Sequence, residues 1–215
     1  MLYIFDLDGT LADTMASITH FCNLALKDAG LAPIDQEPVR DMVGNGRDVL
    51  IHKLLAYYGE DTPARFERAA VVYDDAYSKD FMYLVKEYEG MTQTLRGLRE
   101  RGDRLCVCSN KPDDMARAVA SGLFSADLFD IVMGHRVGIP HKPDPAAALE
   151  IAATLDTQPA KCAFVGDTYV DIETGKNAGM ITVGAEWGFR GRRELEEAGA
   201  DYIIAKPAEL LALCL

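Results

Sequence analysis

Short hydrophobic runs alternate with helix-like stretches along most of the chain. The runs are apolar throughout, which is typical of strands buried on both faces of a parallel sheet. Such strands are expected at Leu2–Phe5, Leu105–Cys108, Asp130–Met133, Cys162–Val165, Ile181–Val183 and Tyr202–Ile204. Segments that end at glycine or open at proline predict helices at Thr92–Arg101, Pro112–Ser121, Pro143–Leu155, Asp171–Ala178 and Pro207–Leu213. The alternation predicts a doubly wound α/β fold with a mostly parallel, Rossmann-like sheet.

The stretch after the first strand breaks this alternation. It shows helical patterns at Met15–Ala29, Arg47–Tyr58 and Pro63–Ser78 and no convincing strand. A helical insertion of roughly 70 residues is too long for an ordinary connection between strands. We therefore expect an α/β core of residues 1–13 and 84–215, with a helical cap domain, residues 14–83, inserted after the first strand.

Composition narrows the class of protein and of partner. The 215 residues are 49% hydrophobic and 26% charged, as in an ordinary globular protein. The net charge of −12 argues against binding to nucleic acid or to an anionic membrane. Neither a secretory signal nor a membrane-spanning stretch is visible, and the cysteines fall mostly in apolar runs, so we expect a cytoplasmic protein with reduced thiols. Monomer and homodimer both stay open.

Charged or hydrogen-bonding side chains follow four of the expected strands. Asp6 and Asp8 come at the end of the first strand, and Gly9 and Thr10 follow them in a turn whose amides are expected near a bound anion. Two neighbouring carboxylates repel each other, so a bound cation or a catalytic task would explain them. Because ligands bind at the carboxyl ends of strands in open α/β sheets, we expect the chemistry at this edge.

The other three groups fit the same edge. Ser109 and Asn110 end the second core strand just before a helix, which forms an anion-binding corner. Lys142 lies between prolines at a helix start, and Asp167 and Asp171 follow another strand. Four carboxylates that converge there need a counter-charge, and oxygen ligands without histidine or cysteine favour Mg²⁺.

Together these strings resemble the motifs of the haloacid dehalogenase-like hydrolase superfamily, and the resemblance covers essentially the whole chain. They are Asp6-x-Asp8-Gly9-Thr10-Leu11, Ser109-Asn110, Lys142 and Gly166-Asp167-x-x-x-Asp171. Further strings look like the phosphoglycolate phosphatase branch of that superfamily. These are Val43-Gly44-Asn45-Gly46, Tyr88-Glu89-Gly90, Ser109-Asn110-Lys111-Pro112 and Trp187-Gly188-Phe189-Arg190, although a proline is usual at the position of Glu89.

The resemblance implies a Mg²⁺-dependent phosphatase that acts on a small phosphorylated metabolite through an aspartyl-phosphate on Asp6. It implies Asp6, the Asp8 carbonyl and Asp167 as direct metal ligands. Asp171 would complete the metal site from in or near the next layer of residues, where it would orient a metal-bound water or Lys142. Asp8 would be the general acid and base, and Lys142 and Ser109 would hold the phosphoryl oxygens. These assignments are implied by the family pattern and are expectations here.

Further expectations concern the substrate. Gly9, Thr10 and Asn110 are expected to contact it, with Asn110 facing the leaving group. In the helical insertion, Asn45, Gly46 and Arg47 are candidates for the leaving group, because glycine lets backbone approach closely and arginine suits a carboxylate. A carboxylate on the leaving group is a feature of 2-phosphoglycolate, which is the substrate we expect. The alternative for Arg47 is a solvent-facing residue at the start of a helix.

Other functions stay open at this point. A sugar phosphomutase or a pyrophosphatase of the same fold would carry the same core motifs. A dehalogenase would not call for an acid at Asp8, and a phosphonatase would need a Schiff-base lysine, for which Lys53 is a weak candidate. A non-enzymatic binding module is disfavoured, because every expected catalytic group is present.

Overall fold

A computed structural model describes residues 1–214, and the chain divides into two compact units. The first unit comprises Met1–Asp13 and Lys86–Leu215, and the second comprises Thr14–Val85. The second unit therefore ends two residues later than residue 83, the expected boundary. The short strands β2 and β3 explain the difference, because Ala12–Asp13 and Lys86–Glu87 pair antiparallel within the first unit. Both residues of β3 are exposed and polar, so no hydrophobic pattern marks them.

The first unit is built on a six-stranded parallel sheet with the order β5-β4-β1-β6-β7-β8. The strands are β1 Leu2–Phe5, β4 Arg104–Pro112, β5 Ile131–His135, β6 Cys162–Gly166, β7 Ile181–Ala185 and β8 Tyr202–Ile204. All six expected strands are present, and the doubly wound, mostly parallel fold is confirmed. Successive strands extend the sheet in opposite directions from β1, which places the crevice for ligands at the carboxyl end of β1.

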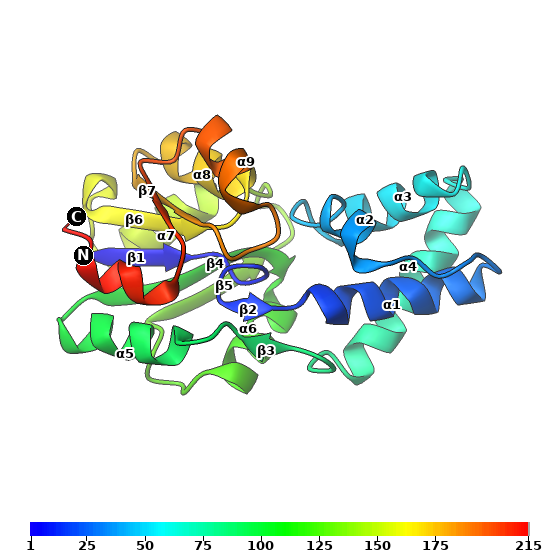
Figure 1. The fold of residues 1–215 in the computed structure, drawn as a ribbon, viewed down its shortest axis with the longest axis horizontal. Coiled ribbons are helices and arrows are strands. Elements are labelled where there is room, and N and C mark those ends of the chain that lie inside the picture. The colour runs from blue at the N-terminus through cyan, green and yellow to red at the C-terminus, as the bar shows by residue number, and fades with distance from the viewer. Residues whose placement is uncertain (215) are drawn as a thin grey trace. The chain divides into compact units, whose positions relative to one another are not determined.

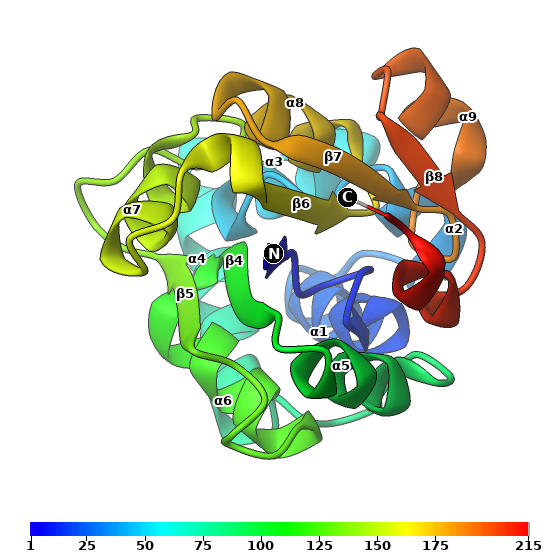
Figure 2. The same cartoon turned by 90° about the vertical axis from the view of Figure 1, so that its left-hand side faces the viewer.

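Helices cover both faces of this sheet (Figure 2). In this unit they are α5 Met91–Glu100, α6 Asp113–Leu123, α7 Ala146–Thr154, α8 Tyr169–Asn177 and α9 Gly191–Glu197, with 3₁₀ turns η1 Pro159–Lys161 and η2 Pro207–Ala212. Helix α7 begins only at Ala146, because prolines occupy the positions before it. The segment expected as a C-terminal helix is the 3₁₀ turn η2.

The core of this unit consists of the sheet and the helices that pack on it. Leu2 and Ile4 of β1 and Phe164 of β6 are fully or almost fully buried, and they join α7 residues such as Ile151 in one hydrophobic cluster. Because β1 is buried on both faces, its side chains are all apolar up to Phe5. The first polar residue after β1 is Asp6, at the point where the strand leaves the sheet.

The second unit contains four helices. They are α1 Met15–Asp28, α2 Gln36–Arg40, α3 Arg47–Tyr57 and α4 Pro63–Lys79 (Figure 1). Thr62 caps α4 with its side chain, and Pro63 occupies the first helical position. Phe21 of α1 contacts the rings of Tyr73 and Tyr77 of α4, so aromatic packing joins these two helices.

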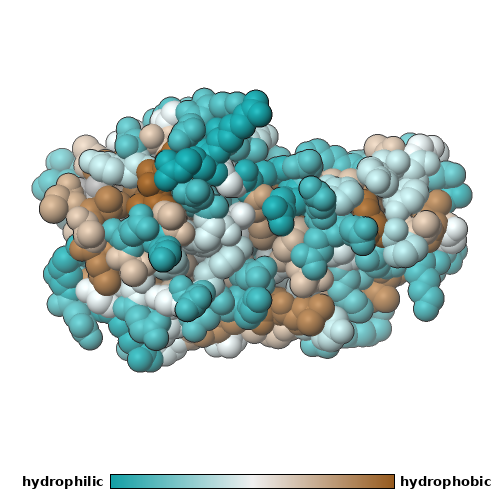
Figure 3. All heavy atoms as spheres, in the orientation of Figure 1, coloured by the Kyte–Doolittle hydropathy of each residue, from teal (hydrophilic) through white to brown (hydrophobic). Residues whose placement is uncertain are grey.

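Hydrophilic side chains cover most of the face drawn in Figure 3, and hydrophobic residues form separate patches among them. Within residues 1–214, no helix is long and apolar enough to cross a membrane.

Candidate active site

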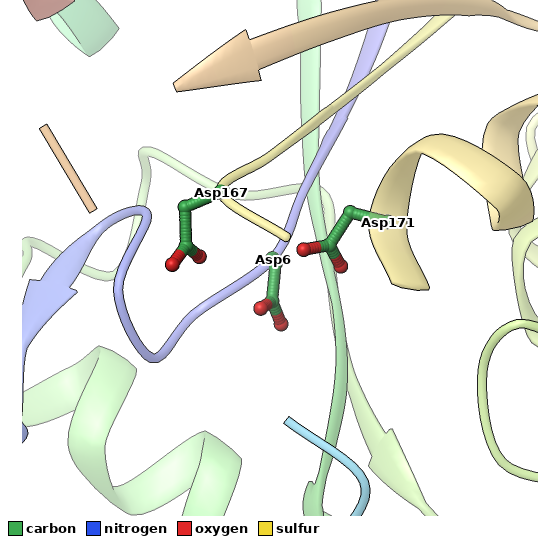
Figure 4. Close-up of side chains that lie close together, drawn as sticks. All are labelled: Asp6, Asp167 and Asp171. Atoms are coloured by element: carbon green, nitrogen blue, oxygen red, sulfur yellow. The ribbon is translucent and has the colours of Figure 1, made fainter. Parts of the chain in front are cut away.

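Three aspartates meet beyond the carboxyl ends of β1 and β6. Asp6 follows β1, Asp167 follows β6, and Asp171 lies in the first turn of α8. Their side chains lie close together (Figure 4), and one oxygen of each lies within 4.8 Å of the others. All three are buried. The two neighbouring strand ends thus bring together acids that are far apart in the sequence, as expected from the strand order.

Lys142 supplies the positive charge next to these acids. Its Nζ lies 2.8 Å from Oδ1 of Asp6 and 2.7 Å from Oδ1 of Asp171. The Asn110 side chain holds the lysine backbone on both sides, because Lys142 N donates to Oδ1 of Asn110 at 2.8 Å and Nδ2 of Asn110 donates to the Lys142 carbonyl at 3.2 Å. Two ion pairs and two hydrogen bonds therefore fix the position of this ammonium group.

The cluster carries more negative charge than Lys142 offsets. Burial raises the pKa of Asp6 to about 7, with Lys142 opposing and Asp171 adding to the rise. Burial also raises the pKa of Asp167 well above its ordinary value, and Asp171 and Asp6 add to this. For Lys142, burial lowers the pKa, but attraction to Asp171 and Asp6 outweighs burial and raises it. The lysine therefore stays charged, and its single positive charge does not offset all three acids.

Asp167 is enclosed by backbone and by one hydroxyl. Oδ1 accepts a hydrogen bond from the Thr10 hydroxyl at 2.9 Å, and Oδ2 accepts one from the Phe189 amide at 2.8 Å. Gly9 has φ of 90°, and a Cβ on Gly9 or Gly188 would lie 2.4 or 2.2 Å from an atom of the Asp167 side chain. Only glycine allows such an approach at both positions. Gly188 belongs to the string Trp187-Gly188-Phe189-Arg190, and its role in enclosing Asp167 is visible only in the structure.

Asp171 has two partners. Its Oδ1 faces Lys142, and its Oδ2 accepts hydrogen bonds from the Thr168 amide at 3.1 Å and the Thr168 hydroxyl at 2.9 Å. These contacts belong to the capping of α8. The same carboxylate therefore fixes the start of a helix and orients the lysine.

Asp8 points to a different partner from the other acids. Its two carboxylate oxygens lie 3.0 and 2.8 Å from Nζ of Lys111. Ser109, on the same strand as Lys111, has a nearly buried hydroxyl whose oxygen accepts a hydrogen bond from the Lys111 amide at 3.2 Å. Lys111 has no expected role from the sequence, and its place in the string Ser109-Asn110-Lys111-Pro112 is the signal that marks it.

Three expected substrate contacts look different in the structure. The amide of Gly9 donates to the Ala12 carbonyl at 2.8 Å, and that of Thr10 lies 3.4 Å from the Leu7 carbonyl, so both serve the turn itself. The Thr10 hydroxyl is taken by Asp167. The Asn110 amide group contacts the Lys142 backbone rather than facing outward. For all three residues, the contacts seen position other parts of the site.

The candidates in the helical unit lie where α3 begins. Gly46 precedes the helix with φ of 84°, and Arg47 is its first residue. The Arg47 guanidinium is 2.8 Å from Asp48 and 3.1 Å from Asp74 of α4. A leaving-group carboxylate would have to compete with these two resident acids for Arg47. Asn45 is half-buried beside Gly46.

The acidic cluster fits a hard divalent cation. Its three carboxylates offer only oxygen, which is the donor that Mg²⁺ prefers. The raised pKa values of Asp6 and Asp167 show that the buried acids are short of positive charge. A divalent ion would supply it. Nearby histidine or cysteine ligands, which would favour zinc, are absent from this cluster within residues 1–214.

Comparison with known proteins agrees with this geometry. A family profile described as "Haloacid dehalogenase-like hydrolase" matches residues 3–185. The chain is 31% identical over 216 residues to a phosphoglycolate phosphatase of Pseudomonas putida, covering 99% of this chain and 79% of the relative. It is 35% identical over 205 residues to a phosphoglycolate phosphatase of Rhodospirillum rubrum, covering 92% and 83%.

A solved structure is similar over nearly its whole length. This is the crystal structure of a predicted phosphoglycolate phosphatase from Haemophilus somnus, with a TM-score of 0.92 and 27% identity. The match covers 98% of this chain and 96% of that one. The family match extends over both units and includes the acidic cluster, Lys142 and Ser109. The chain therefore belongs to the haloacid dehalogenase-like hydrolase family.

Proposed function

We propose that this protein is a Mg²⁺-dependent phosphatase that hydrolyses a small phosphate monoester, 2-phosphoglycolate, through an aspartyl-phosphate on Asp6. The observation that carries the proposal is the buried cluster of Asp6, Asp167 and Asp171 beside the ammonium group of Lys142. The substrate is supported by relatives named phosphoglycolate phosphatase that align along nearly the whole chain.

The cation would be held by Asp6, Asp167 and the Asp8 backbone carbonyl, with Asp171 close by. When bound, Mg²⁺ offsets the charge of the acids and of the phosphoryl oxygens. Lys142 and the Ser109 hydroxyl would hold phosphoryl oxygens from the protein side. The protein has a net negative charge, whereas the substrate is an anion. Lys142 and the metal would make the electrostatic potential positive within the site, so the anion can bind there.

The reaction would take place in two steps. A carboxylate oxygen of Asp6 attacks phosphorus, the bond to the leaving oxygen breaks, and Asp8 donates a proton to that oxygen. Asp8 then accepts a proton from water as the water oxygen attacks phosphorus. The bond between phosphorus and Asp6 breaks, which releases phosphate and restores the carboxylate. Splitting the reaction this way replaces one difficult displacement by two easier ones.

The helical unit is proposed to act as the cap domain that selects the leaving group, because the core motifs handle only the phosphoryl group. Asn45 and Gly46 remain its candidate contacts. For Arg47 we propose mainly a structural role within this unit, since Asp48 and Asp74 already hold its guanidinium.

The test of the proposed function is phosphate release from a panel of esters, with and without Mg²⁺. The panel should hold 2-phosphoglycolate, ethyl phosphate, p-nitrophenyl phosphate, pyrophosphate and β-glucose 1-phosphate. We expect the highest kcat/KM for 2-phosphoglycolate. Conversion of β-glucose 1-phosphate to the 6-phosphate, with little phosphate release from any ester, would instead favour a mutase.

Replacing Asp8 by Asn should slow substrates with poor leaving groups far more than those with good ones. An alkoxide needs a proton as it leaves, whereas nitrophenolate hardly does. General acid catalysis typically contributes about 10²–10⁴-fold, so kcat for 2-phosphoglycolate should fall by that factor and kcat for p-nitrophenyl phosphate much less. Equal losses on both substrates would remove Asp8 from the role of general acid.

A further inference from the structure

Lys111 is a nearly buried lysine whose ammonium group contacts the proposed general acid, Asp8. Its side chain is 8% exposed, that of Asp8 is 19% exposed, and both Asp8 oxygens lie within hydrogen-bond distance of Nζ. A lysine is rarely buried this far unless it is paired. Lys111 belongs to the unit that carries the acidic cluster, and it contacts Asp8, whereas Lys142 contacts Asp6 and Asp171.

Lys111 lies near the end of β4, two residues beyond Ser109. The pairing register of β4 with β5 shifts between Cys108 and Pro112, and in this irregular stretch the Lys111 amide donates to the Ser109 hydroxyl at 3.2 Å. Asn110, between them, contacts the Lys142 backbone. Ser109 is the proposed ligand of the phosphoryl group, and Lys111 contacts Asp8, the acid proposed to protonate the leaving oxygen. The ammonium group of Lys111 is therefore expected next to the leaving group.

We propose that Lys111 binds the anionic end of the leaving group and selects esters that carry a carboxylate there. This inference rests on the proposed function. In the proposed reaction the leaving oxygen is one hydrogen bond away from the Asp8 carboxylate, which is one hydrogen bond away from Nζ of Lys111. As Asp8 turns toward that oxygen, the flexible side chain of Lys111 follows it. The ammonium group then gives up one of its contacts with Asp8 and forms a contact with the substrate carboxylate in its place.

Arg47, the basic candidate from the sequence, is a weaker candidate for this role. Its two resident partners, Asp48 and Asp74, have no proposed part in the reaction, so the ligand would displace both without compensation. Asp8, which Lys111 contacts through both carboxylate oxygens, is the acid that approaches the leaving group itself. The exchange at Lys111 is therefore local to the reacting atoms.

The experiment compares kcat/KM for 2-phosphoglycolate with that for ethyl phosphate, which lacks only the carboxylate. It uses wild type, Lys111→Met, Lys111→Arg and the control Lys161→Met, which removes an exposed lysine of η1. We expect Lys111→Met to lower the ratio of the two values about 10–100-fold, the effect of one lost hydrogen bond between charged groups. Lys111→Arg should keep most of the ratio, and Lys161→Met all of it.

A binding measurement separates recognition from catalysis. In an Asp6→Asn background, calorimetry should show that Lys111→Met weakens 2-phosphoglycolate by a similar factor and leaves ethyl phosphate unchanged. This comparison also shows that the variants are folded, because they still bind a ligand.

The outcomes are distinct. If Lys111→Met lowers both kcat/KM values equally and the binding preference persists, Lys111 acts only through Asp8 and the inference is wrong. A wild type that hydrolyses both esters equally well is a phosphatase without carboxylate selectivity, which also overturns the inference but leaves the phosphatase in place. If wild type releases phosphate from neither ester, the proposed function fails, and the binding comparison still decides whether Lys111 recognises a carboxylate.

Discussion

Replacing Asp6 by Asn should abolish phosphate release while the fold stays intact. The amide has nearly the same shape as the carboxylate but cannot attack phosphorus, and loss of a nucleophile costs about 10⁴-fold or more in kcat. Folding should tolerate the change, because burial already disfavours the charged form of Asp6, as its raised pKa of about 7 indicates. Lys142 keeps its second partner, Asp171. The measurement is kcat together with Tm.

The matched control is Glu173→Gln, which removes one carboxylate from the exposed face of α8. It should leave kcat and Tm unchanged. Acid-quenched wild type incubated with ³²P-labelled ester should also carry the label, and Asp6→Asn should not. Near-wild-type turnover by a folded Asp6→Asn protein would rule out the covalent mechanism.

Removing divalent cations should reduce activity to background, and Mg²⁺ should restore it. Without the cation, the site lacks the positive charge that offsets its acids and the phosphoryl oxygens of the substrate, and Lys142 alone does not supply enough of it. Mg²⁺ should also stabilise the fold. At a hundred-fold excess over Kd a bound ligand contributes about 2.7 kcal/mol, which corresponds to a rise in Tm of about 5–10 °C for a chain of this size. Full turnover in excess chelator would exclude the metal.

The size of this stabilisation should depend on pH. Asp6 and Asp167 have pKa values raised above those of unfolded carboxylates, which lie near 4, so the metal-free folded state holds protons that the unfolded state has lost. The contribution of Asp6 to stability is therefore lost as pH rises from about 4 to about 7, and that of Asp167 is lost as pH rises through its own raised pKa. The rise in Tm on adding Mg²⁺ should be larger at pH 8 than at pH 5. Potassium chloride of equal ionic strength should not reproduce it.

The core unit was largely predictable because burial leaves a clear mark on sequence. Strands such as Leu2–Phe5 and Cys162–Gly166 are covered on both faces, so polar residues are excluded from most of their length. The first polar residue after each strand then marks the edge of the sheet, which is how Asp6 and Asp167 were found. The short strand Lys86–Glu87 could not be found this way, because both residues are exposed and carry no hydrophobic pattern.

The sequence by itself determined which chemical groups stand at the sheet edge, and the tertiary structure decided which of them contact each other. Asn110 was expected at the leaving group and contacts the Lys142 backbone, while Lys111 had no expected role and contacts Asp8. Thr10 was expected at the substrate and donates to Asp167. The pattern of hydrophobic residues shows which positions are buried, because burial follows from which face of its helix or strand a residue occupies. The partner of a polar group depends on how distant segments are brought together. A hydrogen bond forms only within about 3 Å, so a shift of one residue along a strand end gives the group a different partner.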